Sequence, residues 1–395
     1  MSTPPTAAAL PPLQHSSALR ALFDSLRRDN FLLILLAGFA LLSVVAPNRL
    51  ASYPALVDWP TIAALTGLLA LTKGLELSGA MAWLGHRLVA AMATERAAAL
   101  WSVAAAALLS TVLTNDVALF IVVPLTLGVC RVCGLSGMPA TRLIVFEALA
   151  VNAGSALTPI GNPQNLFIWQ LSKAPFGQFV LHMLPLVVST MLVLVALTAC
   201  VFGKRPVAIR DDAIDGAHRT PIDRRLLAVS LGLYLPFLAA TDLHHGGLAV
   251  LAVLATFVLL RPRVLAQLDW GLLLVFVLMF VDLRLLAGLE AVRHAMLGLG
   301  LDQAGHLYFA GIAASQVISN VPAAIALAEY SRDWRVLAYG VNVGGFGFLV
   351  GSLANLIALR MSGDRRAWLS FHAYSLPFLA VAAALGYVLL FYLKA

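Results

Sequence analysis

The stretch NAGSALTPIGNPQNL, which occupies residues 152–166, decides the fold of this chain. It is polar and rich in Gly and Pro, and apolar sequence flanks it on both sides. Pro159 and Pro163 remove two backbone donors, and Gly154 and Gly161 allow backbone conformations that other residues resist. Unpaired peptide groups at membrane depth are tolerated only where protein buries them or where they line a polar cavity. The stretch therefore predicts a broken membrane helix whose amide, hydroxyl and carbonyl groups form a binding site.

The same pattern returns once, as NVGGFGFLVGSLANL at residues 342–356. The residues that match without a gap are Asn152 with Asn342, Gly154 with Gly344, Gly161 with Gly351, Asn165 with Asn355, and Leu166 with Leu356. Interrupted membrane segments at corresponding places in two halves are the best sequence pointer to the binding site of a transporter. Gly-rich packing between membrane helices is the alternative, but it does not require the paired asparagines.

The composition is that of a polytopic membrane protein. Of the 395 residues, 61% are hydrophobic and 11% are charged, and the net charge is +7. The basic residues lie in short loops between apolar runs, which is the membrane pattern and not that of a nucleic-acid-binding surface. We therefore expect an all-α, multi-pass protein of the inner membrane. Its partners would be the lipid bilayer and small ions, with no nucleic acid and no cofactor beyond a coupling ion.

The chain divides into a tail and two repeats. Residues 1–30 predict a cytoplasmic tail, since no signal-peptide pattern occurs there. The first repeat covers 31–202, a cytoplasmic linker with one extra span covers 203–246, and the second repeat covers 247–395.

Most of the expected elements are single spans. They are expected at 31–46, 60–80, 178–202, 226–240, 247–260, 270–289 and 371–393, with re-entrant hairpins at 97–130 and 295–329 and broken helices at 142–171 and 336–359. Treating the two interrupted runs as hairpins keeps most loop Lys and Arg on the side of the N-terminus, which the positive-inside rule makes cytoplasmic. The extra span then inverts the second repeat.

A further match supports the repeat. Asp58, Trp59 and Lys73 align with Asp269, Trp270 and Arg284. Lys73 and Arg284 are cations inside predicted spans, so they either attract an anion or form structural pairs with Glu76 and Glu290. We favour the structural pairs, because long basic side chains near helix ends readily extend to the membrane surface.

The hairpins carry a shared polar pattern. Ser110, Thr114 and Asn115 in the first align with Ser315, Ser319 and Asn320 in the second. Two hydroxyls four residues apart lie on one helix face beside an Asn at the break. Hydroxyl, amide and freed carbonyl oxygens suit Na⁺, and half-helix N-termini suit an anion. Hydrogen bonding of the hydroxyls to their own helix is the alternative.

Together, the hairpin pair and the Thr-Pro-Ile-Gly-Asn-Pro stretch resemble the ion transporter superfamily. This superfamily contains divalent anion:sodium symporters, citrate transporters, arsenite permeases and NhaD-type sodium/proton antiporters. The resemblance covers about residues 55–360 and implies a secondary transporter with an inverted repeat. It implies sodium positions at Ser110, Thr114 and Asn115 and at Ser315, Ser319 and Asn320.

The hairpin tips depart from the symporter pattern. Where the symporters place a substrate-binding Thr, this chain has Asp116 in one tip and Val321-Pro322 in the other. These tips, and Gly351-Ser-Leu-Ala354, look more like arsenite permeases. An ionised Asp116 would repel a dicarboxylate, which counts against citrate or succinate. Asp116 and Glu147 are the candidates for proton coupling, because ionisable groups inside the membrane are functional by default.

The expected substrate- and ion-binding residues are Ser110, Thr114, Asn115, Asp116, Asn152, Gly154, Thr158, Gly161, Asn162, Asn165, Ser315, Ser319, Asn320, Asn342, Gly344, Gly351, Ser352 and Asn355. The expected function is secondary transport of a small anion or an arsenite-like oxyacid, coupled to H⁺ or Na⁺. Na⁺/H⁺ antiport and citrate-type di- or tricarboxylate:Na⁺ symport are the alternatives. The fold also allows a homodimer. No metalloprotease, paired-aspartate or Gly-x-Ser-x-Gly motif occurs, so we do not expect an enzyme.

Overall fold

The computed structural model describes residues 30–45, 47–81, 83, 94–132, 138–205, 221–364 and 366–393. Helices and short 3₁₀ turns are the regular elements that form within these ranges. This confirms the all-α prediction. The expected cytoplasmic tail up to residue 29, and the middle of the expected linker at 206–220, lie outside the described residues.

Each half contains a hairpin followed by a broken helix. The helices of the first half are α2 (Asn30–Val45), α3 (Tyr53–Leu56), α4 (Trp59–Leu77), α6 (Glu95–Val112), α7 (Asn115–Val132), α8 (Met138–Ser155), α9 (Pro163–Ser172) and α10 (Phe176–Val201). Those that follow are α12 (Arg224–Asp242), α13 (Gly246–Leu260), α14 (Pro262–Ala266), α15 (Trp270–Ala287), α16 (Glu290–Leu297), α17 (Ala304–Ile318), α18 (Asn320–Ala328), α19 (Trp334–Gly344), α20 (Leu353–Ser362) and α21 (Ala367–Phe391). The 3₁₀ turns are η1 (Pro47–Ser52) and η3 (Leu349–Gly351).

The helices fall close to the expected ranges, with one correction. The second hairpin was expected from residue 295, but its first helix, α17, begins at Ala304. The preceding residues form the separate short helix α16, whose C-cap is Gly298. Gly300 follows with a φ of 61°, a conformation that suits glycine and turns the chain away from the α16 axis.

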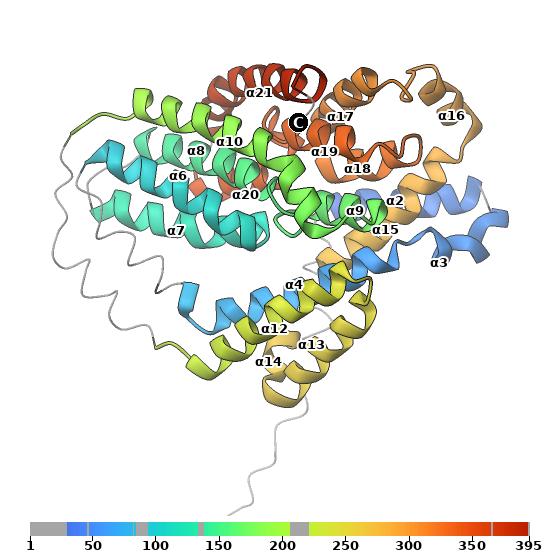
Figure 1. The fold of residues 1–395 in the computed structure, drawn as a ribbon, viewed down its shortest axis with the longest axis horizontal. Coiled ribbons are helices and arrows are strands. Elements are labelled where there is room, and N and C mark those ends of the chain that lie inside the picture. Colours follow the sequence, from blue (N-terminus) through green and yellow to red (C-terminus); the bar gives the residue numbers. More distant parts are fainter. Residues whose placement is uncertain are drawn as a thin grey trace, which may run out of the picture.

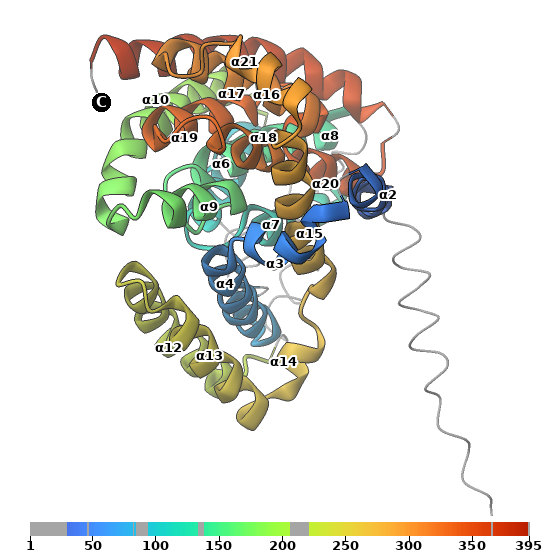
Figure 2. The same cartoon turned by 90° about the vertical axis from the view of Figure 1, so that its right-hand side faces the viewer.

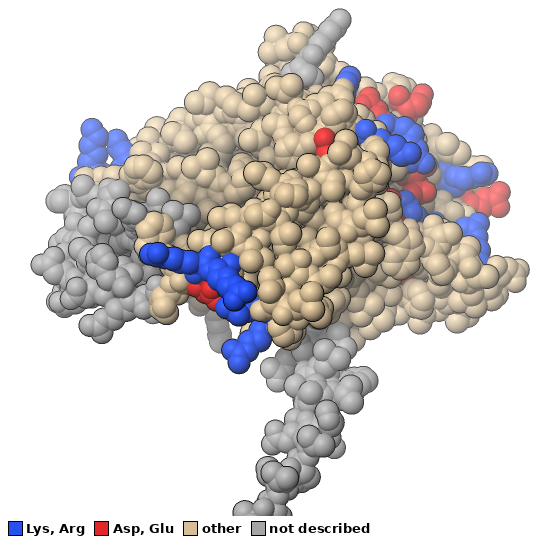
Figure 3. Space-filling model, turned by 60° about the horizontal axis from the view of Figure 1, so that its bottom comes forward, with Lys and Arg blue, Asp and Glu red and all other residues tan. Residues whose placement is uncertain are grey.

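The outer surface is that of a membrane protein. Among the described residues, α10, α12, α15 and α21 are long and apolar enough to cross a membrane, and α2 with the segment up to Leu56 would be a fifth span bent by 117°. Large apolar side chains point outward from these and neighbouring helices, as at Leu259 of α13, which is 81% exposed. In Figure 3, Lys and Arg gather in a few groups, with broad uncharged surface between them. Lipid, not water, suits such a surface.

The Asp-Trp pairs form the same local structure in both halves. Asp58 caps α4 by accepting from the N–H of Thr61 at 3.0 Å, and Asp269 caps α15 by accepting from the N–H of Leu272 at 2.9 Å. In each half the following tryptophan donates its indole N–H to the carbonyl five residues before it, at 2.8 and 3.0 Å. The sequence match therefore marks a structural equivalence between α4 and α15.

Equivalent helices of the two halves make equivalent packing contacts, both within each half and between the halves. Helix α6 packs on α8 as α17 packs on α19, while α9 contacts α18 as α20 contacts α7. Likewise α2 packs on α15, and α13 packs on α4. Figures 1 and 2 show α4, α12, α13 and α14 together toward the bottom, with the hairpins and broken helices above them. The reciprocal contacts agree with a two-fold repeat. The opposite orientation of the two halves in the membrane stays a prediction.

Candidate functional site

Both hairpins break at their predicted tips, but in different ways. Helix α6 ends at Val112 and α7 begins at Asn115, with an extended residue, Leu113, between them. Helices α17 and α18 are separated by Ser319 alone, which has φ 74° and ψ 156°. That region of backbone space is nearly exclusive to glycine and costs another residue about 1–3 kcal/mol. Strain of this kind persists only where the surroundings hold it, and it is concentrated at functional sites.

The broken helices meet through an exchange of asparagine side chains. Asn152 of α8 donates its amide to Asn355 Oδ1 of α20 at 2.7 Å. Asn342 of α19 donates to Asn165 Oδ1 of α9 at 2.6 Å. All four side chains are buried. Each bond joins one repeat to the other, so the four repeat-related asparagines form two cross-repeat pairs at the interface between the halves.

The same asparagines satisfy the unwound backbone. The Nδ2 of Asn165 lies 3.3, 3.0 and 3.2 Å from the carbonyls of Ser155, Ala156 and Thr158. The Nδ2 of Asn355 donates to the carbonyl of Gly345 at 2.9 Å. Carbonyls freed by a helix break must find donors inside the membrane. The asparagines therefore stabilise the unwound backbone of the two helix breaks, and they also join the two breaks to each other.

The N-termini of the two half-helices differ. At the start of α9, Asn162 Oδ1 accepts from the N–H of Asn165 at 2.9 Å, and its amide donates to Asn342 Oδ1 and Ser155 Oγ at 3.1 and 3.2 Å. At the start of α20 the matching residue is Ser352, which is 0% exposed and whose hydroxyl has no hydrogen-bond partner among the described residues. A helix N-terminus with an unused hydroxyl is suited to a polar ligand.

The hairpin serines lie against the broken helices. A Cβ added to Gly154 would lie 2.6 Å from Ser110 Oγ, and one added to Gly344 would lie 2.6 Å from Ser315 Oγ. Each hydroxyl donates to its own helix, Ser110 to the carbonyl of Ala107 at 2.9 Å and Ser315 to that of Gly311 at 2.7 Å. The hydroxyl protons are thus used in hydrogen bonds to their own helices, which is the alternative stated for the sequence pattern. The lone pairs of the hydroxyl oxygens remain able to accept from, or coordinate, a ligand.

The asparagines of the tips also reach the breaks. The N–H of Asn115 donates to the carbonyl of Gly161 at 2.9 Å, which ties the first tip to its broken helix. A Cβ added to Gly345 would lie 3.2 Å from Asn320 Nδ2 and 3.5 Å from Asn152 Oδ1, so the second tip lies beside the asparagine of the first repeat.

Three more predicted residues lie at the same breaks. Thr114 is buried at the first tip. Thr158 donates its hydroxyl to the carbonyl of Thr111 at 2.6 Å. A Cβ added to Gly351 would lie 2.7 Å from the carbonyl oxygen of Gly344, so only a glycine fits that turn without displacing backbone.

Comparison with known proteins gives the class. The sequence model of the citrate transporter family (CitMHS) matches residues 19–338. The chain belongs to the citrate transporter family. It is 48% identical over 372 residues to the inner membrane protein YbiR of Escherichia coli, covering 94% of this chain and 98% of YbiR. It is 33% identical over 256 residues to the transporter MJ0456 of Methanocaldococcus jannaschii, covering 64% and 68%. It is 26% identical over 364 residues to the transporter Rv2685 of Mycobacterium tuberculosis, covering 82% and 83%. The protein is therefore a multi-pass membrane transporter.

Among the described residues of this citrate transporter family member, three carboxyl groups have an enclosed oxygen without a hydrogen-bond partner. Asp116 lies at the first tip, where its Oδ1 is enclosed and has no hydrogen-bond partner in the described part of the chain, and the Asp269 carboxylate is its electrostatic neighbour. Glu147 is 0% exposed within α8; its Oε1 accepts a hydrogen bond from Thr126, while its Oε2 has no partner that the structure describes. Asp282 of α15 is also buried, and a Cβ added to Gly38 of α2 would lie 3.3 Å from its Oδ2. Sequence reasoning missed Asp282, although an acid within an apolar span was a usable signal.

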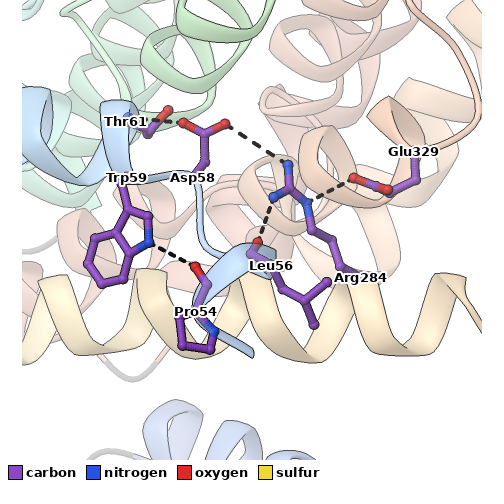
Figure 4. A network of polar contacts seen from close by, with 7 residues as sticks. All are labelled: Pro54, Leu56, Asp58, Trp59, Thr61, Arg284 and Glu329. Carbon is purple, nitrogen blue, oxygen red and sulfur yellow. Dashed lines mark hydrogen bonds and ion pairs between the residues drawn. The ribbon is translucent and has the colours of Figure 1, made fainter. Parts of the chain in front are cut away.

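The intramembrane cations of this transporter have structural partners, one of them unexpected. Lys73 pairs with Glu76 at 2.6 Å, as predicted. The prediction that Arg284 pairs with Glu290 is wrong. Figure 4 shows that its guanidinium instead contacts Glu329 at 2.9 Å, the carbonyl of Leu56 at 2.6 Å and Asp58 at 4.0 Å. Glu329 is the C-cap of α18, so packing between elements far apart in the chain provides the partner.

Proposed function

We propose that this transporter is a secondary active carrier of a small anion or oxyacid across the inner membrane, coupled to H⁺ or Na⁺. The observation that carries the proposal is the asparagine exchange, which joins the two helix breaks; both hairpin tips lie against those breaks. In transporters with discontinuous helices, half-helix N-termini face anionic groups of the substrate and unwound carbonyls coordinate the coupling ion. The unpartnered hydroxyl of Ser352 at the start of α20 supports a polar substrate at that terminus.

The charges at the tips favour a substrate with little negative charge. Asp116 has an enclosed oxygen, and no Lys or Arg among the described residues pairs with it. A di- or tricarboxylate placed beside this group would meet an uncompensated acid in a low-dielectric site. An uncharged or singly charged oxyacid such as arsenite avoids that cost. Citrate-type symport is the less favoured alternative, although the family takes its name from it.

One observation favours a second candidate, Na⁺/H⁺ antiport. The residues around the breaks offer amide, hydroxyl and carboxyl oxygens, while Lys73 and Arg284 pair with acids away from them. Such a donor set suits a hard cation, and carboxyls that exchange Na⁺ for protons would need no organic substrate.

Transport by purified protein in proteoliposomes tests the proposal. Uptake of arsenite and of citrate would be measured under separately imposed proton and sodium gradients, and an internal pH dye would report Na⁺/H⁺ exchange. We expect gradient-driven arsenite uptake. Asn320→Ala should abolish it, whereas Asn48→Ala, an exposed asparagine in η1, should not. Sodium-driven citrate uptake would overturn the oxyacid assignment, and wild-type uptake by Asn320→Ala would remove the second tip from the site.

The proposed orientation has its own test. Single cysteines in a cysteine-free background would be labelled with a membrane-impermeant maleimide from either side. The positive-inside pattern predicts that Arg205→Cys reacts from the cytoplasm and Arg332→Cys from outside. Labelling of both from one face would end the inverted-repeat proposal.

A further inference from the structure

Three polar side chains meet where α6, α7 and α8 pack together, away from the hairpin tips. Thr126 of α7 donates its hydroxyl to Oε1 of Glu147 in α8. The hydroxyl of Ser102 in α6 lies 3.4 Å from that of Thr126 and also interacts with the carboxyl. All three residues are buried. The second carboxyl oxygen, Oε2, is enclosed and has no hydrogen-bond partner within the ranges that the structure describes.

No cation among the described residues neutralises this carboxyl. Helix α8 packs against α6, α7, α10, α20 and α21. The ionisable side chains that the structure describes on these helices are Glu95, Arg96, Asp116, Cys130, Arg142, His182, Cys200, Arg360, His372, Tyr374 and Tyr387. Within the described residues the hydrogen-bond and electrostatic partners of Glu147 are Thr126 and Ser102. An unpaired charge buried at this depth is costly, so the enclosed oxygen requires either a proton or a bound cation.

The second repeat shows that this cluster is not needed for packing. In the hairpin alignment Ser102 corresponds to Leu307, and in the broken-helix alignment Glu147 corresponds to Leu337. Both leucines are buried where α17 packs on α19, the counterpart of the α6–α8 interface. At these two positions a hairpin helix and a broken helix can therefore pack through apolar side chains. The first repeat nevertheless has a buried acid, Glu147, where the second repeat has a leucine. Because apolar packing is possible at this position, the acid points to a function.

We propose that Ser102, Thr126 and Glu147 form a proton site between the first hairpin and α8, where Glu147 Oε2 takes up and releases the coupling proton. This rests on the proposed secondary transport and names its coupling group. A proton fits better than Na⁺, because the cluster offers only one carboxyl and two hydroxyls, too few oxygens for a full coordination shell. The proton arrives from water on one side and leaves to water on the other, and no other bond is made or broken.

The position of Glu147 explains how its charge would act on transport. The two hydroxyls belong to the hairpin, whereas Glu147 belongs to the helix that carries Asn152 five residues later. Loss of the proton leaves Glu147 negatively charged in an interface without water. The charge favours a conformation in which the first hairpin lies further from α8 and water can enter between them. Protonation allows the dry interface to close.

Infrared titration of the purified full-length protein tests the site without a known substrate. We expect the carbonyl-stretch band of a protonated carboxylic acid to disappear reversibly as pH is raised in the wild type. Glu147→Gln should remove that titrating band, and Glu76→Gln, an exposed glutamate on α4, should leave it. Thr126→Val keeps the carboxyl but removes its donor, so it should shift the midpoint of the titration. Titrating bands that are identical in the wild type and in Glu147→Gln, or a wild-type Glu147 band that never titrates, would overturn the proposal, whereas a band that Glu147→Gln leaves in place belongs to another enclosed carboxyl such as Asp116 or Asp282.

Proteoliposomes separate this inference from the proposed function. With arsenite, citrate and Na⁺ as probes, Glu147→Gln should lose the response of transport to an imposed pH gradient and keep ligand-induced thermal stabilisation. Proton-driven uptake that survives in Glu147→Gln would refute the site and leave the transport function intact. If the wild type moves none of the probes but the infrared titration behaves as expected, the proton site stands and the proposed function falls. A sodium response lost in Glu147→Gln would make this a cation site instead.

Discussion

Gly154→Ala tests how closely the first hairpin must approach its broken helix. The added Cβ would lie 2.2 Å from the carbonyl oxygen of Ala107 and 2.6 Å from its Cα. Both are backbone atoms, so α6 and α8 would have to separate by roughly 1 Å. Overpacking of this kind costs about 1–3 kcal/mol, with rigid backbone at the upper end, and alanine recovers about 1 kcal/mol of helix propensity. We expect the free energy of unfolding to fall by about 2 kcal/mol.

Unfolding of purified protein by SDS, followed by tryptophan fluorescence and circular dichroism, measures the change. Gly128→Ala in α7 is the matched control, since no atom of the described residues lies within 4 Å of its added Cβ, and it should be neutral or stabilising. Gly344→Ala meets the side chain of Ser315 at 2.5 Å, so adding Ser315→Gly should largely restore stability. No side-chain change offers the same relief at Gly154. Equal stability of Gly154→Ala and Gly128→Ala would refute the close contact.

Three further outcomes are expected. Ser319→Gly should raise the free energy of unfolding by about 1–3 kcal/mol in the same assay, because glycine adopts its backbone conformation without strain; no gain would mean that the tip is unstrained. Asn342→Ala should cost about 1–3 kcal/mol, because the buried Asn165 Oδ1 loses its donor, and a double-mutant cycle of these two residues should show coupling. The backbone N–H groups capped by Asp223, and the Arg261 guanidinium, hold the pKa of that carboxyl below its usual range. Its stabilisation is therefore complete above the unfolded-state pKa and is lost as pH falls through the lower folded-state value. Thermal unfolding midpoints should consequently fall less steeply at acid pH in Asp223→Asn than in the wild type.

Local sequence patterns predicted the parts of this fold that depend on nearby residues. Helix breaks follow from Gly and Pro within polar stretches, and the gapless alignment of 152–166 with 342–356 gives half-helices that begin at matching residues, Pro163 and Leu353. The Asp-Trp pairs likewise form the same cap in both halves because a cap involves only neighbouring residues.

Contacts between segments that lie far apart in the chain could not be predicted from the sequence patterns. The repeat shows that Asn152 and Asn342 are equivalent positions. It does not show that Asn152 bonds Asn355, or that Asn342 bonds Asn165, across the interface between the halves. The partner of Arg284 was missed for the same reason, since Glu329 lies 45 residues away in another element. The partners of Glu147 come from two other helices, and their register depends on packing that no single helix encodes.

The similarities and differences between the repeats separate scaffold from chemistry. The asparagine exchange and the contact of each hairpin serine with a glycine occur in both halves, as expected of a framework whose two conformations are related by the repeat. The two repeats differ at these three aligned pairs of positions, among others: Glu147 aligns with Leu337, Asn162 with Ser352, and Asp116 with Val321. Each difference places an enclosed carboxyl oxygen, or a hydroxyl without a partner among the described residues, in one half alone, at a cost that the other half avoids. A proton and a substrate need chemically distinct sites, so this asymmetry is where we expect coupling to arise.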